Sequence, residues 1–289
     1  MQFTYFTSNK TFYQDKDLRD AYLDEEATDF PVLRFHSLSA FDWLGAAFTT
    51  RHGGISIGHL ASLNLGFHRG DDLSTVKENY TRIAKRLGFP LSSVVLTDQV
   101  HGTNIVEVDA SHCVGEAFTK KLKYTDGIYT DHTGLVLCAS FADCVPIYLV
   151  DPVTRRIALV HSGWRGTVDQ ISAKAVSLLI GSGTRPEDCI AVIGPSISQP
   201  NYEVSIDVLD AFRAQFSEET CKDIFYLTDP FHGQLDLWAA CYYTLVTAGL
   251  SPEHIHFSGL CTHENFMHLF SHRRTNGQRG NLNAFLWLK

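Results

Sequence analysis

Residues 135–150, LVLCASFADCVPIYLV, constrain the fold most, because the run is too apolar for a surface element. Pro146 and the polar pair Asp143–Cys144 interrupt it, so it predicts two buried pieces that meet at a corner rather than one helix. RRIALVH, at 155–161, predicts another buried strand, and this strand ends on His161. The centre of the chain therefore predicts a buried sheet whose strand ends carry polar side chains.

Strand and helix patterns alternate along the rest of the chain. Apolar periodicity predicts helices over 75–87, 168–181, 205–216 and 236–249; Thr75 with Glu78 forms an expected capping box, Ser205 is an expected cap, and Gly88, Gly181 and Gly249 are stops. Strands are predicted within 93–102 and 104–110, around a turn, and within 190–194 and 254–259. This alternation indicates an α/β fold with a mixed β-sheet core flanked by helices, although it does not give the strand order.

Composition narrows the class of protein. The 289 residues contain no linker, repeat or low-complexity run, so one large domain is expected. The net charge of -8 and the scattered basic residues argue against nucleic acid or an anionic membrane as partner. No apolar run approaches the ~18 residues that span a bilayer, and residues 1–20 do not look like a signal or transit peptide. Seven cysteines without a framework pattern then indicate reduced thiols and a cytoplasmic location.

Three polar residues each end or interrupt an apolar segment: His101, Cys144 and His161. Two imidazoles and a thiol at one end of a sheet would offer three ligands for Zn²⁺ and leave a fourth position open, as catalytic zinc requires. Asp143 would then be a neighbouring partner or a proton carrier. The spacing matches no compact zinc-finger pattern, so a buried cysteine with two hydrogen-bonded histidines is the structural alternative.

Several long motifs follow one another along the chain: FTTRHGGISIGHLASLNLGFHRGDD (48–72), DQVHG (98–102), TDGIYT (125–130), ADCVPIYLVDP (142–152), HSGWRGT (161–167), IGPSIS (193–198), YEV (202–204) and SHRR (271–274). In sequence and order they resemble the YfiH family, known as laccase-domain proteins or multicopper polyphenol oxidases. The resemblance implies a single YfiH-like (cytotoxic necrotizing factor-like) α/β domain over 48–289, with 1–47 as an N-terminal extension packed on it or leading into it. It also implies zinc bound by His101, Cys144 and His161.

The same resemblance implies a zinc-dependent purine nucleoside enzyme. The expected reactions are phosphorolysis of adenosine, inosine, guanosine and methylthioadenosine, and deamination of adenosine, with nucleosides and phosphate as the small-molecule partners. Cys144, Asp143 and His101 are the expected catalytic residues. Arg51 and Arg165 suit an anion, and Ser62 and Asn64 suit hydrogen bonds to ribose or phosphate.

Two other functions stay open on the sequence. Cys144 paired with His101 or His161 could act without metal as a cysteine hydrolase or amidase, and relatives link such chemistry to peptidoglycan precursor editing. A copper-dependent polyphenol oxidase needs several His-x-His pairs, and only His254–His256 has that spacing. Any bound copper is therefore expected to be adventitious.

Overall fold

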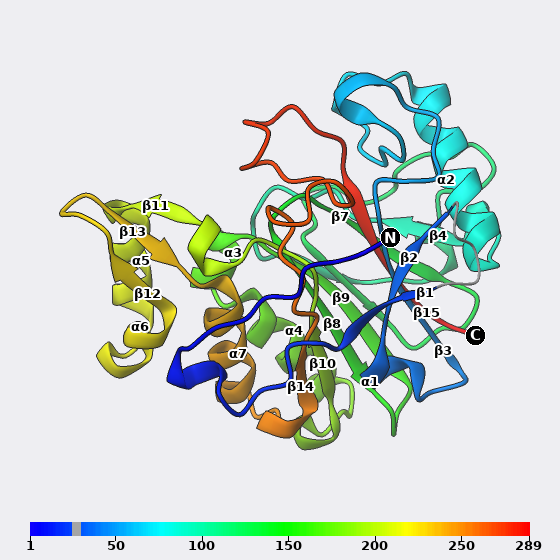
Figure 1. Cartoon of the computed structure of the whole chain (residues 1–289). Helices are drawn as coiled ribbons and strands as arrows, with labels where there is room; N and C mark the ends of the chain where they lie inside the picture. The colour runs from blue at the N-terminus through cyan, green and yellow to red at the C-terminus, as the bar shows by residue number, and fades with distance from the viewer. Residues whose placement is uncertain (25–29) are drawn as a thin grey trace.

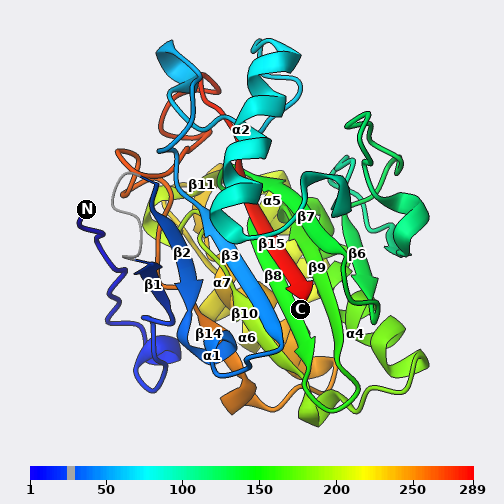
Figure 2. The ribbon, with the colours of Figure 1, turned by 90° about the vertical axis from the view of Figure 1, so that its right-hand side faces the viewer.

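The computed structural model describes residues 1–24 and 30–289. In that part of the chain, two six-stranded sheets pack face to face, and helices cover their outer faces (Figures 1 and 2). No helix among the described residues has the length and apolarity needed to cross a membrane. The expected mixed α/β fold is confirmed.

The first sheet brings together strands from distant parts of the chain. Its order is β1 (Ala21–Asp24), β2 (Val32–Phe35), β3 (Leu44–Thr49), β15 (Leu282–Leu288), β7 (Val136–Phe141) and β4 (Val94–Leu96). All neighbours are antiparallel except β4 and β7, which run parallel. The strand β15 was not predicted, and it holds the middle of this sheet.

The second sheet carries the strand ends that the sequence singled out. Its order is β14 (Ile255–Phe257), β10 (Ile190–Ile193), β8 (Val145–Asp151), β9 (Arg156–Ser162), β6 (Gly127–Thr130) and β5 (Ile105–Glu107). The expected corner within 135–150 is confirmed, because β7 and β8 are separate strands that belong to different sheets. The two strands expected around a turn, within 93–102 and 104–110, also belong to different sheets, β4 to the first and β5 to the second.

Both faces of the second sheet are buried, which explains why its strands read as unbroken apolar runs. Along β8, Ile147 and Leu149 point to the helices, whereas Tyr148 and Val150 point to the first sheet. The neighbouring β9 follows the same period of two, with Leu159 on the side of the first sheet. Side chains of the two sheets thus form one continuous core between them.

Helices close the outer faces. The first sheet is covered by α2 (Leu73–Leu87), and the second by α4 (Ile171–Gly181) and α7 (Leu237–Thr247). Shorter helices are α1 (His36–Ser39), α3 (Trp164–Val168), α5 (Ile206–Gln215) and α6 (Glu218–Ile224). The last two lie beside a three-stranded sheet of β11 (Glu203–Ser205), β13 (His232–Leu235) and β12 (Phe225–Leu227), at the left of Figure 1.

The helix ends differ from the expected ones in detail. The Thr75–Glu78 capping box is wrong, because α2 begins earlier, at Leu73, with Asp72 as its N-cap. Ser205 does occupy the N-cap of α5, but its side chain makes no capping hydrogen bond. Gly88 ends α2 in the left-handed conformation, with φ of 81°.

The expected extension over residues 1–47 contributes to the same core. Its strands β1 and β2 pair within the first sheet, and Phe6 and Tyr13 pack against Trp238 of α7 and Phe257 of β14. Strand β3 crosses the expected boundary at residue 47, and residues 25–29 lie outside the described residues. The boundary itself stays a prediction.

Truncating Leu159 tests the packing between the sheets. Leu159 is 0% exposed, so Leu159→Ala leaves a cavity and should lower the free energy of unfolding by about 2 to 5 kcal/mol. Urea denaturation of both proteins measures the difference. Val153→Ala, at a position that is 70% exposed, is the matched control and should change stability little. Equal stability of wild type and Leu159→Ala would contradict the described core.

Candidate metal centre and its cleft

Three segments converge at one end of the second sheet. Cys144 stands at the corner between β7 and β8, and antiparallel pairing of β8 with β9 sets Pro146 opposite His161. His101 lies in the loop that follows β4, and a bridge between Asp98 and Thr125 brings that loop to the start of β6. Pairing across strands therefore places side chains together that are far apart in the sequence.

The three expected ligands come together in the structure. The ligand atoms of His101, Cys144 and His161 all lie within 4.8 Å of one another, and they are the one such group of three or more in residues 1–24 and 30–289. The distance from Cys144 Sγ to His101 Nε2 is 3.8 Å. His161 is buried, Cys144 is half-buried and His101 is exposed, so the group is open to solvent on one side.

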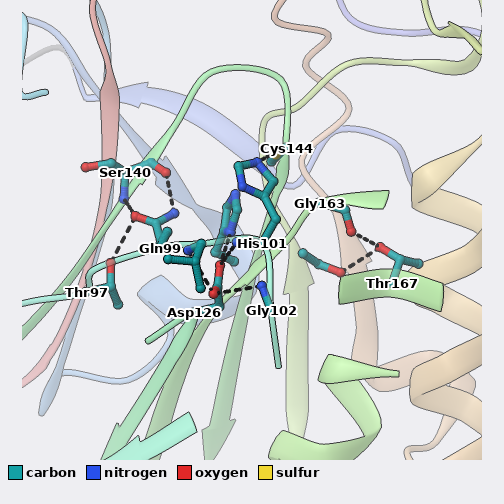
Figure 3. A network of polar contacts seen from close by, with 12 residues as sticks. Thr97, Gln99, His101, Gly102, Asp126, Ser140, Cys144, Gly163 and Thr167 are labelled. Carbon is teal, nitrogen blue, oxygen red and sulfur yellow. Dashed lines mark hydrogen bonds and ion pairs between the residues drawn. The ribbon is translucent and has the colours of Figure 1, made fainter. Parts of the chain in front are cut away.

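A buried carboxylate, Asp126, holds this arrangement (Figure 3). It accepts hydrogen bonds from the backbone N–H groups of Val100, His101 and Gly102 at 3.0, 2.9 and 2.9 Å. It also accepts one from Nδ1 of His161 at 2.8 Å. Asp126 thereby fixes the His101 loop and the His161 ring with one side chain.

Gln99 fixes the same loop from its other side (Figure 3). Its amide oxygen accepts a hydrogen bond from the Ser140 backbone N–H at 2.9 Å, and its amide nitrogen donates to the Ser140 carbonyl at 2.7 Å. The loop before His101 is therefore attached to the end of β7. His101 itself adopts a left-handed backbone, with φ of 63°, which a histidine holds only where its surroundings impose it.

The donor set fits a zinc ion. Two imidazole nitrogens and a thiolate are ligands that zinc prefers, and three of them leave a fourth position open. Because Nδ1 of His161 donates to Asp126, its Nε2 is the nitrogen that faces Cys144. The absence of a side chain at Gly163 leaves space for His101 and Cys144, since a Cβ at residue 163 would lie 2.9 Å from His101 Cδ2 and 3.2 Å from Cys144 Sγ.

The electrostatics of the group favour a thiolate. Burial alone would raise the pKa of Cys144, but the charge of His161 and the hydrogen bonds from His101 and His161 lower the pKa to about 6. Burial would lower the pKa of His161, whereas Cys144 and Asp126 raise it to about 9. The side chains are therefore arranged as a thiolate beside an imidazolium when no metal is present.

The group opens into a cleft of about 540 Å³. Aromatic side chains on its wall are Phe67, Phe141, Trp164 and Tyr202, and cationic side chains are Arg69, Lys120, Arg165, Arg273 and Arg279. The cleft combines flat apolar surfaces with positive charge, and these suit a planar base and an anion respectively.

Asp143 also lines the cleft, yet its carboxylate is already engaged. One oxygen accepts a hydrogen bond from the Thr262 hydroxyl at 2.6 Å, and the other accepts from the backbone N–H of Arg273 at 2.7 Å. Its backbone is left-handed, with φ of 88°. In this structure, Asp143 ties the Cys144 corner to the segment around Arg273.

Of the residues expected to contact the substrate, one lines the cleft and three do not. Arg165 lines the cleft from α3, and its guanidinium lies 4.2 Å from the Trp164 ring centre. Arg51, Ser62 and Asn64 do not line this cleft. Arg51 donates to the carbonyls of Ala61 and Phe266 and lines an adjoining cavity of about 310 Å³.

Ser62 and Asn64 make hydrogen bonds to backbone groups of the protein. Ser62 donates to the Arg51 carbonyl at 3.1 Å. Asn64, which is fully buried, accepts from the backbone N–H groups of Gly66 and Asn281 at 2.9 and 3.0 Å. Both side chains hold the backbone, and their roles as substrate contacts stay predictions.

Asp126, Arg69 and Arg279 were not predicted. Asp126 lies in TDGIYT and Arg69 in the long motif of 48–72, so motif membership was an available signal for these two. Arg279 lies beyond SHRR, where no pattern indicated it. Arg279 is therefore revealed by spatial proximity alone.

Comparison with known proteins then identifies the family. The family described as "Multi-copper polyphenol oxidoreductase laccase" matches residues 45–289. The crystal structure of the Bacillus licheniformis hypothetical protein YfiH covers 92% of this chain and 99% of its own, with a TM-score of 0.86 and 34% identity. The chain belongs to the YfiH family.

Relatives within the YfiH family carry a functional name. "Purine nucleoside phosphorylase YlmD" of Geobacillus stearothermophilus is 40% identical over 244 residues, which is 83% of this chain and 89% of that protein. The protein of the same name from Bacillus subtilis is 38% identical over 254 residues, 84% of this chain and 88% of its own. The crystal structure of the Geobacillus YlmD matches with a TM-score of 0.85, 37% identity and coverage of 92% and 98%.

Replacing Asp126 tests whether it supports metal binding in this YfiH-family chain. Asp126→Asn removes the charge that orients His161, and the new amide N–H groups face the donors of Val100 and Gly102. We expect zinc affinity to fall roughly 10- to 100-fold, measured by competition with a chromophoric chelator. Asp131→Asn, which removes an exposed partner of Arg156, is the control. Equal zinc affinity of Asp126→Asn and wild type would refute the supporting role.

Proposed function

We propose that this chain is a zinc-dependent purine nucleoside phosphorylase that also deaminates adenosine. The observation that carries the proposal is the His101–Cys144–His161 group, open on one side, at the base of a cleft with aromatic and cationic walls. The names of the YlmD relatives support purine nucleosides and phosphate as substrates. Inosine, guanosine, adenosine and methylthioadenosine are the proposed nucleosides.

His101, Cys144 and His161 would hold the zinc ion. When bound, zinc supplies Lewis-acid chemistry at its open coordination position and polarises an oxygen of substrate or solvent. Asp126 keeps the His161 ring in one orientation and one tautomer. Copper is not proposed as the working metal, because multicopper oxidases need several His-rich sites, and the described residues hold one group of this kind.

In phosphorolysis, a phosphate oxygen forms a bond to the ribose C1′ while the bond from C1′ to the purine N9 breaks. The bonding electron pair leaves with N9, which takes up a proton, so the products are ribose 1-phosphate and the free base. The cleft contributes positive charge for the phosphate and flat surfaces, such as Trp164 and Phe141, for the base. We propose Arg165 as a contact to the anion.

In deamination, water adds at C6 of adenosine and ammonia leaves, which gives inosine. The reaction needs a group that moves a proton between water and the leaving nitrogen. Asp143 lines the cleft and lies next to Cys144, so it is the proposed proton carrier. Its hydrogen bonds to Thr262 and Arg273 would keep its carboxylate at a fixed place.

Element analysis and product chromatography test the proposal together. Protein purified without added metal should contain about one zinc per chain. It should release hypoxanthine from inosine only with phosphate, and it should form inosine from adenosine without phosphate. Cys144→Ala should lose zinc and both activities, whereas Cys113→Ala, at a half-buried cysteine outside the cleft, should keep them. If the zinc-loaded protein leaves all four nucleosides unchanged, with and without phosphate, the proposal is wrong.

A second candidate function is a metal-free cysteine hydrolase or amidase, with peptidoglycan precursors as proposed substrates. The arrangement of Asp126, His161 and Cys144 favours this function, because a carboxylate orients an imidazole that faces a thiol of lowered pKa. A thiolate that binds zinc cannot act as a free nucleophile. Metal occupancy therefore separates the two candidates.

Alkylation of Cys144 distinguishes them directly. With a pKa of about 6, the metal-free thiol is mostly thiolate at pH 7.5 and should react rapidly with iodoacetamide. The zinc proposal predicts that Cys144 in the purified protein reacts only after a chelator removes the metal, as peptide mass spectrometry will show. Cys138, whose burial raises its pKa to about 12, is the unreactive internal control. Rapid labelling without chelator would favour the hydrolase.

A further inference from the structure

Two guanidinium groups meet in the cleft from opposite ends of the chain. Arg69 donates from Nε to the side-chain oxygen of Asn281 at 3.2 Å, and Arg279 donates from Nη1 to the same oxygen. Both arginines line the cleft that contains Cys144. One amide oxygen thus holds two positive side chains side by side.

Neither guanidinium has a carboxylate partner within 4 Å in the described part of the chain. Arg279 is only 7% exposed. Its Nη1 also donates to the Gly280 carbonyl at 3.2 Å and its Nη2 lies 3.5 Å from His272 Nδ1, whereas its Nε has no hydrogen-bond partner. Arg69 is half-buried, and no acceptor among residues 1–24 and 30–289 meets its Nη1 or Nη2. Burial and the charge of Arg69 lower the pKa of Arg279 to about 10, which is the expected cost of two neighbouring cations.

Residues around the two arginines hold them in place. The Asn64 side chain accepts from the Asn281 backbone N–H and from Gly66, so it joins the two segments. Gly66 has no room for a side chain, since a Cβ there would lie 2.9 Å from Arg69 Cγ and from Asn281 Cγ. The buried Nε of Arg279 and the two Nη groups of the half-buried Arg69 are thus donors that an anion from solution would complete.

The other arginines of the cleft differ from this pair in their surroundings. Arg273 donates from Nη1 to the Glu203 carbonyl and lies 5.0 Å from the Tyr202 ring centre. Arg165 is exposed and stacks on Trp164. Arg279, by contrast, is buried and is electrostatically coupled to Asp143 and Cys144, which places its charge near the proposed zinc group.

We propose that Arg69 and Arg279 form the subsite for a phosphate dianion in this cleft, and that inorganic phosphate is its ligand. The inference rests on the proposed phosphorolysis, for which this subsite would hold the attacking phosphate. Paired guanidinium groups bind a tetrahedral oxyanion through several charge-assisted hydrogen bonds. Asn64 and Asn281 are positioning residues for this pair, which gives the expected substrate residue Asn64 an indirect role.

Arg69→Gln is the principal test, because Arg69 is half-buried and its replacement leaves the core intact. Binding of inorganic phosphate to the zinc-loaded protein is measured by titration calorimetry, and the KM for phosphate and for inosine is measured in turnover. We expect phosphate affinity to fall roughly 10- to 100-fold, with a matching rise in the phosphate KM and a small change for inosine. Arg69→Lys should recover part of the loss.

Two further variants complete the design. Arg279→Gln should have the same effect on phosphate, provided that its melting temperature and zinc content match those of wild type. Arg274→Gln changes an exposed arginine of the same segment that does not line the cleft, and it should bind phosphate normally. Inosine 5′-monophosphate serves as a second ligand, because its phosphate ester offers the same chemistry as the free ion.

The outcomes separate the subsite from the reaction. Normal phosphate binding by Arg69→Gln would overturn the subsite, even if wild type performs phosphorolysis. Binding that is lost in Arg69→Gln while wild type releases no base would uphold the subsite and reject phosphorolysis. Arg69-dependent binding of the nucleotide without any binding of inorganic phosphate would overturn the assignment of the free ion.

Discussion

One buried carboxylate organises the functional end of this protein. Asp126 accepts hydrogen bonds from three successive backbone N–H groups and one imidazole, each at a normal distance of 2.8 to 3.0 Å. A loop with a left-handed histidine would not keep that shape alone, because its donors would turn to water. The ligand geometry thus depends on a residue that touches neither the cleft nor the proposed metal.

Much of this arrangement could be predicted, because the candidate ligand residues lie where apolar strand segments end. His161 is the next-to-last residue of β9 and Cys144 directly precedes β8, so the apolar pattern of the sequence alone marks both. The corner between β7 and β8 was predicted for the same reason: proline and a polar pair cannot continue a buried element. Predictions of this kind hold because they depend only on residues that are adjacent in the sequence, and these residues stay adjacent in the folded chain.

What could not be predicted depends on partners that are distant in the sequence. An aspartate in T-D-G has the signature of any turn. Its His161 donor becomes visible only when β6 lies against β9, and its three backbone donors only when the Asp98–Thr125 bridge brings in the loop after β4. Asn64 fits a substrate contact by residue type, yet its oxygen meets the backbone of Asn281 instead. The pair of Arg69 and Arg279 could not be predicted, because both are ordinary basic residues until Asn281 joins them in the folded chain.

The position of β15 has a consequence for how the chain is made. It hydrogen-bonds to β3 on one side and to β7 on the other, so β3 and β7 share no backbone pairing and are joined within the sheet through β15. During synthesis, β3 and β7 therefore present open apolar edges until residues 282–288 leave the ribosome. Such edges pair readily with other chains, so the incomplete sheet is open to aggregation until β15 is in place.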